Sequence, residues 1–276
     1  MLATGQHNST ADGDARCIPA PTPETQAFLD EREQAVDLQW LQLERGMRVL
    51  DLGCGTGGIT RQIARAVQPA RVLGIDASPA QLGFAVRHAI ADGVANVDFV
   101  CDDACHPQLP PESFDVVVCH TLLMYLDTPA AALARQRQLV VPGGMVAALS
   151  EGDWGTVAIY PPSEHLQQCI DVLCNHIRRS GGDPEIGRKL PRLFRAAGFQ
   201  HVEVAEAAPH ATVLSGRDLA HGTWLAPLLG VLTAAARHGL IAPDAIDEVT
   251  AGVTQWCQQP DSLVILPCTV KARAWR

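Results

Sequence analysis

Residues 48–67 read RVLDLGCGTGGITRQIARAV, and this stretch decides the fold. The apolar run from Val49 to Leu52 predicts a buried strand, and closely spaced glycines follow it. Apolar side chains then recur at helical spacing from Ile59 to Val67. Strand, glycine turn and helix form the first half of a βαβ crossover. In such a unit the glycines let the backbone approach a ligand, which the first N–H groups of the helix then face.

The glycine spacing alone fits two classes of cofactor site. Gly53, Gly55 and Gly58 match the G-x-G-x-x-G pattern of dinucleotide sites, whereas Gly53, Gly55 and Gly57 match a G-x-G-x-G pattern. Asp51 discriminates between them, because a carboxylate at the end of this strand would repel a pyrophosphate. It would suit a ligand that carries an ammonium and a sulfonium but no phosphate. S-adenosyl-L-methionine (SAM) is such a ligand, and VLDLGCGTG resembles the first motif of class I SAM-dependent methyltransferases.

Two more acids are expected at strand ends. Asp76 ends the predicted strand 71–76, where a carboxylate accepts hydrogen bonds from two ribose hydroxyls, of SAM or of NAD alike. Asp103 and Ala104 follow the predicted strand 97–100, and the resembled family has a carboxylate here that accepts the adenine N6 amine. A third acid at a third strand end is hard to explain within a dinucleotide site. The resemblance implies these cofactor-binding residues: Asp51, Gly53, Gly55, Gly57, Asp76, Ala77, Asp103, Ala104 and Cys119.

The resemblance continues along the chain. LPPESFD at 109–115 and VVPGG at 140–144 resemble two further family motifs, so the similarity runs from about residue 45 to 153. It implies an α/β fold of the class I, Rossmann-like kind, with a doubly wound, seven-stranded, mostly parallel sheet. The fifth strand is predicted at 145–150. In the family the last strand, expected here at 263–272, lies antiparallel between the fifth and sixth strands.

The ends of the chain predict the domain organisation. Residues 1–23 are polar with several Gly and Pro, which predicts a mobile N-terminal arm. Residues 24–276 are expected to form one methyltransferase domain with a helical cap. The predicted cap comprises an N-terminal helix at 24–43 and segments at about 155–190 and 210–260. In the family such an N-terminal helix folds over the cofactor, and ordinary packing on the sheet is the alternative.

A candidate base lies at the end of the fourth predicted strand. Methyl transfer from a sulfonium is an in-line displacement, so the protein has mainly to align donor and acceptor and to exclude water. A base is needed only where the acceptor loses a proton. His120 ends the strand next to the expected sulfonium, and histidine titrates near neutral pH. We therefore take His120 as the candidate catalytic residue, with packing beside the cofactor as the alternative.

Residues after the fourth and fifth strands are candidates to bind the substrate. Glu151 and Asp153 end the fifth strand and are expected to face the same cleft. There they would bind a cationic acceptor, act as a base, or be solvated. Tyr125 and Trp154 are candidates to wall the acceptor site, and Trp224 falls in the predicted cap.

Composition excludes several other classes of protein. The formal net charge of −9 disfavours a nucleic-acid surface, and no apolar stretch is long enough to cross a bilayer. The N-terminus has neither the basic start nor the apolar middle of a signal peptide, so we expect a cytoplasmic protein. Nine cysteines, an odd number without a paired framework, fit a reducing compartment. Cys101, Cys105 and His106 lie close in sequence but have no second ligand cluster, so no metal site is expected.

The sequence thus predicts a SAM-dependent methyltransferase that acts on an O, N or C atom of a small, partly apolar metabolite. The resemblance is to the quinone-biosynthesis and natural-product branch, which suggests a role in secondary metabolism. We expect a monomer or homodimer whose partner is a small-molecule substrate. Two alternatives stay open: an enzyme that binds SAM but catalyses a rearrangement or cyclisation, and an NAD-dependent oxidoreductase.

Overall fold

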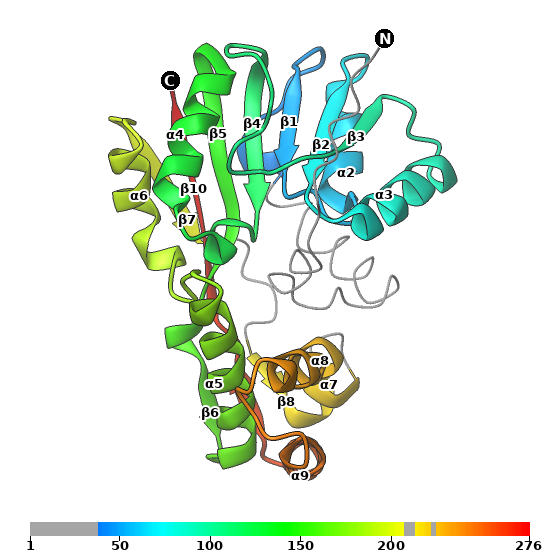
Figure 1. The fold of residues 1–276 in the computed structure, drawn as a ribbon, viewed down its shortest axis with the longest axis vertical. Helices are drawn as coiled ribbons and strands as arrows, with labels where there is room; N and C mark the ends of the chain where they lie inside the picture. Colours follow the sequence, from blue (N-terminus) through cyan, green and yellow to red (C-terminus); the bar gives the residue numbers. More distant parts are fainter. Residues whose placement is uncertain (1–37, 207–212, 222–224) are drawn as a thin grey trace.

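The computed structural model describes residues 38–206, 213–221 and 225–276. The predicted N-terminal arm, most of the predicted N-terminal helix and Trp224 lie outside these residues. The described chain forms a large sheet flanked by helices, with a second lobe beyond the carboxyl ends of its parallel strands (Figure 1).

The large sheet has seven strands in the order β3-β2-β1-β4-β5-β10-β7. Neighbours from β3 to β5 are parallel, and β10 is antiparallel to both β5 and β7. The predicted sheet and the antiparallel insertion of its last strand are therefore confirmed. The strands are β1 (Val49–Leu52), β2 (Val72–Asp76), β3 (Val97–Cys101), β4 (Phe114–His120), β5 (Val140–Asp153), β7 (Val202–Glu206) and β10 (Cys268–Trp275).

Helices cover both faces of this sheet, because its central strands carry apolar side chains that point alternately to the two sides. On one face, Val116 and Val118 of β4 pack with α2 (Gly58–Val67). On the other face, Val117 packs with α4 (Pro129–Leu139) and α6 (Leu190–Ala196). In the same lobe, α3 (Pro79–Ala91) packs against β3. Ser78 caps α3 by accepting the Gln81 N–H, as its position before Pro79 predicts.

The second lobe has its own core, in which α5 packs against α8 and α9. Its helices are α5 (Glu164–Arg179), α7 (Gly216–His221), α8 (Leu225–Arg237) and α9 (Ala245–Cys257). It also holds a three-stranded antiparallel sheet in the order β6-β9-β8, which was not predicted. These strands are β6 (Ala158–Tyr160), β8 (Val213–Ser215) and β9 (Leu263–Ile265).

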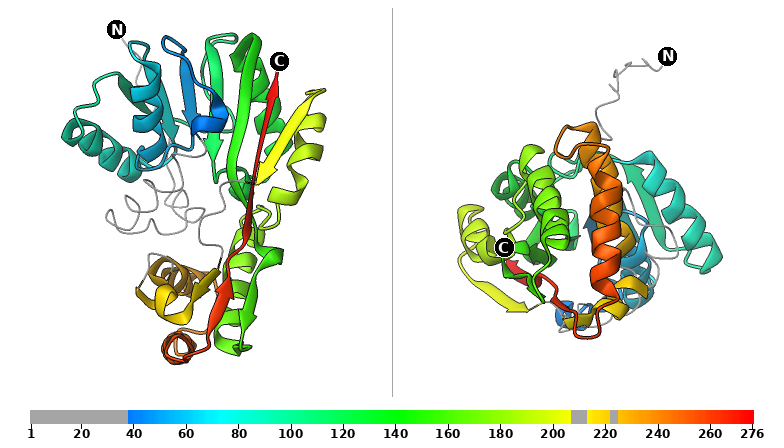
Figure 2. Two further views of the ribbon diagram at one scale, coloured as in Figure 1. Left: turned by 180° about the vertical axis from the view of Figure 1, so that it is seen from behind. Right: turned by 90° about the horizontal axis from the view of Figure 1, so that it is seen from below.

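Two sequence predictions about strands need correction. The run 263–272 was expected to be one strand, but it contributes β9 to the small sheet and the start of β10 to the large one. Pro267 lies between them and has no N–H to give to a ladder, which explains the break. The fifth strand is also longer than predicted, since β5 extends to Asp153. Figure 2 shows β10 continuing up from the second lobe into the large sheet.

Two short 3-10 helices, η3 (Trp154–Thr156) and η4 (Gly187–Lys189), lie on described connections between the lobes. A third, η2 (Leu123–Tyr125), follows β4 within the first lobe. Trp154 lies at the junction, where its side chain packs against the cores of both lobes.

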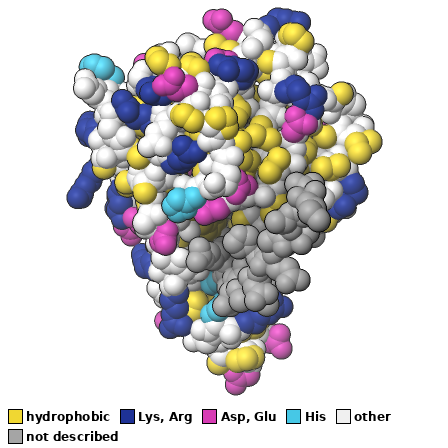
Figure 3. Space-filling view, turned by 45° about the horizontal axis from the view of Figure 1, so that its top comes forward, with side chains coloured by type: hydrophobic (Ala, Val, Ile, Leu, Met, Phe, Trp, Pro, Cys, Tyr) yellow, Lys and Arg dark blue, Asp and Glu magenta, His cyan; other side chains and the backbone are white. Residues whose placement is uncertain are grey.

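Two classes of protein that the composition disfavours can be compared with the structure: nucleic-acid-binding proteins and proteins that span a membrane. On the face that Figure 3 shows, basic and acidic side chains are interspersed rather than gathered into one basic surface. Among the described residues, every helix is too short or too polar to cross a membrane.

Candidate active site

The glycine turn after β1 combines a packed side and an open side. Gly53, Gly55 and Gly57 all have positive φ (71°, 53° and 76°), a conformation that other residues adopt only at a cost in free energy. A Cβ on Gly53 would lie 2.8 Å from a methyl carbon of Leu122, and one on Gly57 2.9 Å from the Phe99 ring. On Gly55 it would have no described atom within 4 Å. The turn is therefore packed at its two ends and open in the middle, where a ligand can approach the backbone.

Asp76 lies at the tip of β2, beside this turn. Its Oδ2 accepts the Gly55 N–H at 2.9 Å, and its Oδ1 accepts the Ser78 N–H at 2.8 Å. These two bonds hold the carboxylate between the glycine turn and the start of α3. Each oxygen has a further lone pair, so the group can still accept the two hydroxyls of a ribose.

Asp51, on β1, is more deeply placed than the sequence predicts. Only 1% of it is exposed, and its Oδ2 accepts the Thr60 hydroxyl at 2.6 Å. Thr60 is fully buried on α2, so this bond ties the helix to the strand and orients the carboxylate. Thr60 was not predicted as a site residue, because its one signal in the sequence is a hydroxyl on the apolar face of the helix.

Asp103 lies in the loop that follows β3. Its Oδ1 accepts the Cys105 N–H at 2.8 Å, and its Oδ2 lies 3.1 Å from Nδ1 of His106. Partial burial raises the pKa of Asp103, but these two hydrogen-bonding groups outweigh it, and the pKa is below its usual value. The carboxylate is therefore ionised, and it remains largely exposed and open to a further donor.

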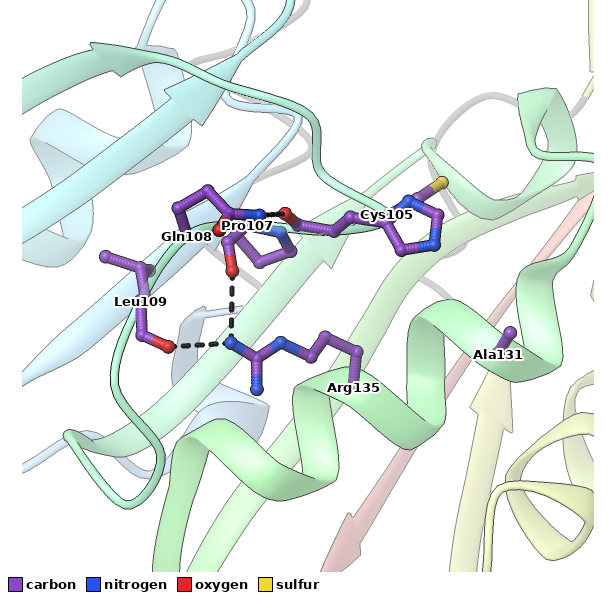
Figure 4. A pocket seen from close by; sticks show the side chains of 7 residues that line it. Cys105, Pro107, Gln108, Leu109, Ala131 and Arg135 are labelled. Carbon is purple, nitrogen blue, oxygen red and sulfur yellow. Dashed lines mark hydrogen bonds between the residues drawn. The ribbon is translucent and has the colours of Figure 1, made fainter.

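The loop after Asp103 is fixed from α4 by a residue that the sequence analysis missed. Arg135 donates from Nη2 to the carbonyl oxygens of Pro107 (3.0 Å) and Leu109 (2.6 Å), as Figure 4 shows. The loop and the helix enclose an open pocket of about 470 Å³. Its lining residues are Cys105, His106, Pro107, Gln108, Leu109, Ala131 and Arg135.

The tip of β4 is built from unusual backbone. Thr121, directly after His120, has φ +48°, and Ser150 on the adjacent β5 has φ +51°. Positive φ is an outlier for a β-branched residue and costs about 1–3 kcal/mol, so surrounding contacts must hold it. The Thr121 N–H donates to the Leu149 carbonyl at 3.0 Å. The Thr121 hydroxyl lies 3.2 Å from both His120 Nδ1 and the Ser150 carbonyl oxygen.

Glu151 has a different role from the one predicted. It was expected to face the cleft, but it is fully buried. Its Oε1 accepts the N–H groups of Leu122 (3.0 Å) and Leu123 (2.9 Å), and its Oε2 accepts that of Met124 (3.2 Å). Burial raises the pKa of Glu151 to about 7, although the three N–H donors oppose the rise. This carboxylate therefore holds η2 onto β5.

Asp153 also departs from its predicted exposure, since only 4% of it is exposed. Arg188 of η4 binds both carboxylate oxygens, at 2.5 and 2.6 Å. This two-bond pair joins the end of β5 to a segment 35 residues away, and no pattern in the sequence indicates it. Asp153 thus fixes the connection between the lobes rather than pointing at a substrate.

The remaining predicted site residues differ in burial. Cys119 is fully buried at the end of β4, where burial raises its pKa well above the usual value. Ala104 is buried, whereas Ala77 is exposed beside Asp76. Tyr125 is partly buried in η2 and packs against the core of the first lobe.

Together these features place the glycine turn and the tips of β1, β2 and β4 side by side at the carboxyl edge of the sheet. The register pairs Leu52 with both Ile75 and Cys119, so the tips adjoin. Ligands of open α/β sheets bind at this edge. A doubly wound sheet whose strand tips adjoin at one edge is typical of nucleotide-binding α/β folds.

Comparison with known proteins identifies the family. A methyltransferase domain family matches residues 49–144. The chain is 31% identical over 217 residues to the probable methyltransferase ltbC of Aspergillus luteorubrus, covering 72% of this chain and 71% of that one. It is also 31% identical over 182 residues to the ubiquinone biosynthesis O-methyltransferase of Burkholderia pseudomallei (strain K96243), covering 63% and 75%. The chain belongs to the class I SAM-dependent methyltransferases, in the quinone and small-molecule branch, and the cofactor of this family is SAM.

The similarity covers only part of some relatives, and its identity to solved structures is low. The chain spans about three fifths of the length of the first curated relatives that it matches. Among solved structures, the cyclase SpnF superimposes with a TM-score of 0.53 and 21% identity, covering 94% of this chain and 84% of that one. At this identity the likeness shows the fold alone.

Proposed function

We propose that this protein transfers a methyl group from SAM to an oxygen, nitrogen or carbon atom of a small, partly apolar metabolite. One observation carries the proposal. The Asp76 carboxylate is held by the Gly55 and Ser78 N–H groups beside an open glycine turn, and it keeps lone pairs for a ribose diol. Membership of this family argues against the NAD-dependent oxidoreductase, because the family's cofactor is SAM.

The residues of the site fit this cofactor. Asp76 would bind the ribose hydroxyls, and Asp103, ionised and accessible, would accept from the adenine amine. Gly55 leaves room for the ligand against the backbone. SAM supplies an electrophilic methyl group and a neutral thioether as leaving group, so the protein has to align the acceptor, exclude water and take up a proton. His120 is our proposed base, which favours oxygen or nitrogen as the acceptor.

Three observations support a small-molecule substrate. The second lobe lies beyond the carboxyl edge of the sheet, where it would restrict access to the site (Figure 1). The net charge of −9 disfavours nucleic acid. Relatives whose names include ubiquinone biosynthesis O-methyltransferase support an aromatic or quinol-like acceptor in quinone or secondary metabolism. We propose that the protein acts in the cytoplasm as a monomer or homodimer.

The experiment combines binding with product analysis. Calorimetry should detect binding of SAM and S-adenosylhomocysteine, and Asp76→Ala should weaken it by about 10- to 100-fold, the scale for hydrogen bonds to a charged group. Asp98→Ala is the matched control, since Asp98 is an exposed acid on β3 paired with Arg71. Incubation with methyl-labelled SAM and a panel of catechols, quinols and amines should give a labelled product and equimolar S-adenosylhomocysteine.

One alternative stays open in this experiment. The second possibility is a SAM-binding enzyme that rearranges or cyclises its substrate, because such an enzyme would hold the cofactor with the same residues. Conversion of a substrate without methyl gain and without SAM consumption would favour that alternative. Absence of SAM binding in the full chain would refute both.

A further inference from the structure

The Thr121 hydroxyl bridges two groups at the tip of β4. Its Oγ1 lies 3.2 Å from Nδ1 of His120 and 3.2 Å from the carbonyl oxygen of Ser150. The two partners come from adjacent strands, since His120 ends β4 and pairs with Leu149, the residue before Ser150 on β5. The hydroxyl therefore joins the histidine ring to the backbone of the next strand.

Elementary hydrogen-bond chemistry fixes the direction of this chain of bonds. A carbonyl oxygen can only accept, and a hydroxyl has a single hydrogen to give. The Thr121 hydroxyl must therefore donate to the Ser150 carbonyl and accept from His120. If its hydrogen instead pointed at the ring, two oxygen atoms would face each other at 3.2 Å with no hydrogen between them. Nδ1 of His120 is thus the protonated ring nitrogen, and in the neutral ring Nε2 carries the lone pair.

The backbone around Thr121 holds this arrangement. Thr121 and Ser150 both have positive φ, a conformation that persists in such residues only where neighbouring contacts enforce it. The Thr121 N–H is bound by the Leu149 carbonyl. The three residues that follow Thr121 are bound by the buried Glu151 carboxylate through their N–H groups. Thr121 is therefore fixed on both sides, and its hydroxyl has a defined position beneath the histidine.

We propose that Thr121 is a positioning residue that holds His120 in the Nδ1–H tautomer, so that Nε2 is the atom that takes the proton of the methyl acceptor. This inference rests on the proposed function. In the transfer step the acceptor's lone pair forms the bond to the methyl carbon, and the carbon–sulfur bond breaks with its electron pair going to sulfur. The acceptor's proton passes to Nε2. The positive charge of the sulfonium thus ends on the imidazolium, whose Nδ1–H still donates to Thr121.

The tautomer can be measured without any substrate. Nitrogen-15 NMR of the full chain labelled at histidine distinguishes the two neutral ring forms, and the His120 signal is identified by its absence in His120→Asn. We expect the wild type and Thr121→Ser to show a protonated Nδ1, because both keep the hydroxyl. Thr121→Val has the same shape and β-branching but no hydroxyl, and it should shift the ring toward the Nε2–H form.

Two results would overturn the proposal. One is an Nε2–H tautomer in the wild type, a measurement that stands even if Thr121→Val does not fold. The other is an unchanged ring signal in folded Thr121→Val, whose folding is checked by thermal unfolding.

Kinetics provide the second readout. Thr121→Val should lower kcat by about tenfold or more, because a misplaced base loses part of the roughly 10²–10⁴-fold that general base catalysis contributes. The SAM dissociation constant should stay within about twofold of the wild-type value. Thr121→Ser keeps the hydroxyl, so its kcat should stay close to the wild-type value. Equal kcat in Thr121→Val and the wild type would contradict the proposed role. If the wild type has the expected tautomer but transfers no methyl group, the proposed function fails while the hydrogen-bond assignment stands, so the two failures are distinguishable.

Discussion

Two neighbouring parts of the carboxyl edge are built in opposite ways. The turn after β1 reaches positive φ through glycine, and its partner Asp76 is held by backbone N–H groups. The tip of β4 reaches positive φ at Thr121, and the facing residue of β5, Ser150, does the same. There the conformation is held by side chains, above all the buried Glu151. The first part takes its positive φ from glycines in its own sequence, whereas the second holds positive φ at non-glycine residues through contacts between strands.

The largest effect should come from removing the carboxylate that holds the β4 tip. Glu151→Ala leaves three N–H groups without their acceptor, and we expect a loss of about 4 kcal/mol in the free energy of unfolding. Denaturant unfolding measures it. Glu151→Gln keeps one acceptor oxygen and should lose less than half as much. A loss below about 1 kcal/mol in Glu151→Ala would show that the tip is held by other contacts.

The same carboxylate should make stability depend on pH. The pKa of Glu151 is raised by burial from 4.5 to about 7, so the folded state binds its proton more tightly than the unfolded state does. The stabilisation that this raised pKa gives to the folded state is fully present below about pH 4.5, and it is lost as the pH rises through about 7. The loss amounts to about 3 kcal/mol. Unfolding measured from pH 5 to 8 should show wild type weakening relative to Glu151→Gln, and parallel curves would contradict the assignment.

At the glycine turn the expected effects are smaller and separate folding from binding. Gly57→Ala places a methyl group 2.9 Å from the Phe99 ring in a left-handed backbone, which should cost about 2–3 kcal/mol of stability. Gly55→Ala meets no described atom within 4 Å and should cost only about 1 kcal/mol, yet it should weaken SAM binding. Unfolding and calorimetry on both variants test the difference. Equal stability losses with unchanged binding would mean that the ligand does not use the open side.

The difference between the glycine turn and the β4 tip also shows which parts of the fold and of the site can be predicted from the sequence. The strand, glycine turn and helix from Val49 to Val67 follow from local spacing, and the order of the large sheet follows from the resemblance. The partners of Glu151 and Asp153 lie about 30 residues away in sequence. Acids at strand ends were expected to face a ligand, but both are buried, Glu151 against backbone N–H groups and Asp153 against the Arg188 guanidinium. The sequence carries no periodic signal for such contacts. The break that places β9 in a second sheet is different, because Pro267 itself indicates it and was overlooked when 263–272 was predicted as one strand.

A further small effect tests whether α2 holds Asp51 in place at the end of β1. Thr60→Val keeps the buried volume but removes the hydroxyl that donates to Asp51, which should cost about 1–2 kcal/mol of unfolding free energy. Thr254→Val, which removes an exposed hydroxyl bonded within its own helix, is the matched control and should change stability by less than about 0.5 kcal/mol. If Thr60→Val also weakens SAM binding, the helix orients Asp51 for the ligand, and the end of β1 depends on a side chain of α2. If binding and stability both stay at the wild-type values, the glycine turn positions the strand end by itself, and the contrast with the β4 tip becomes sharper.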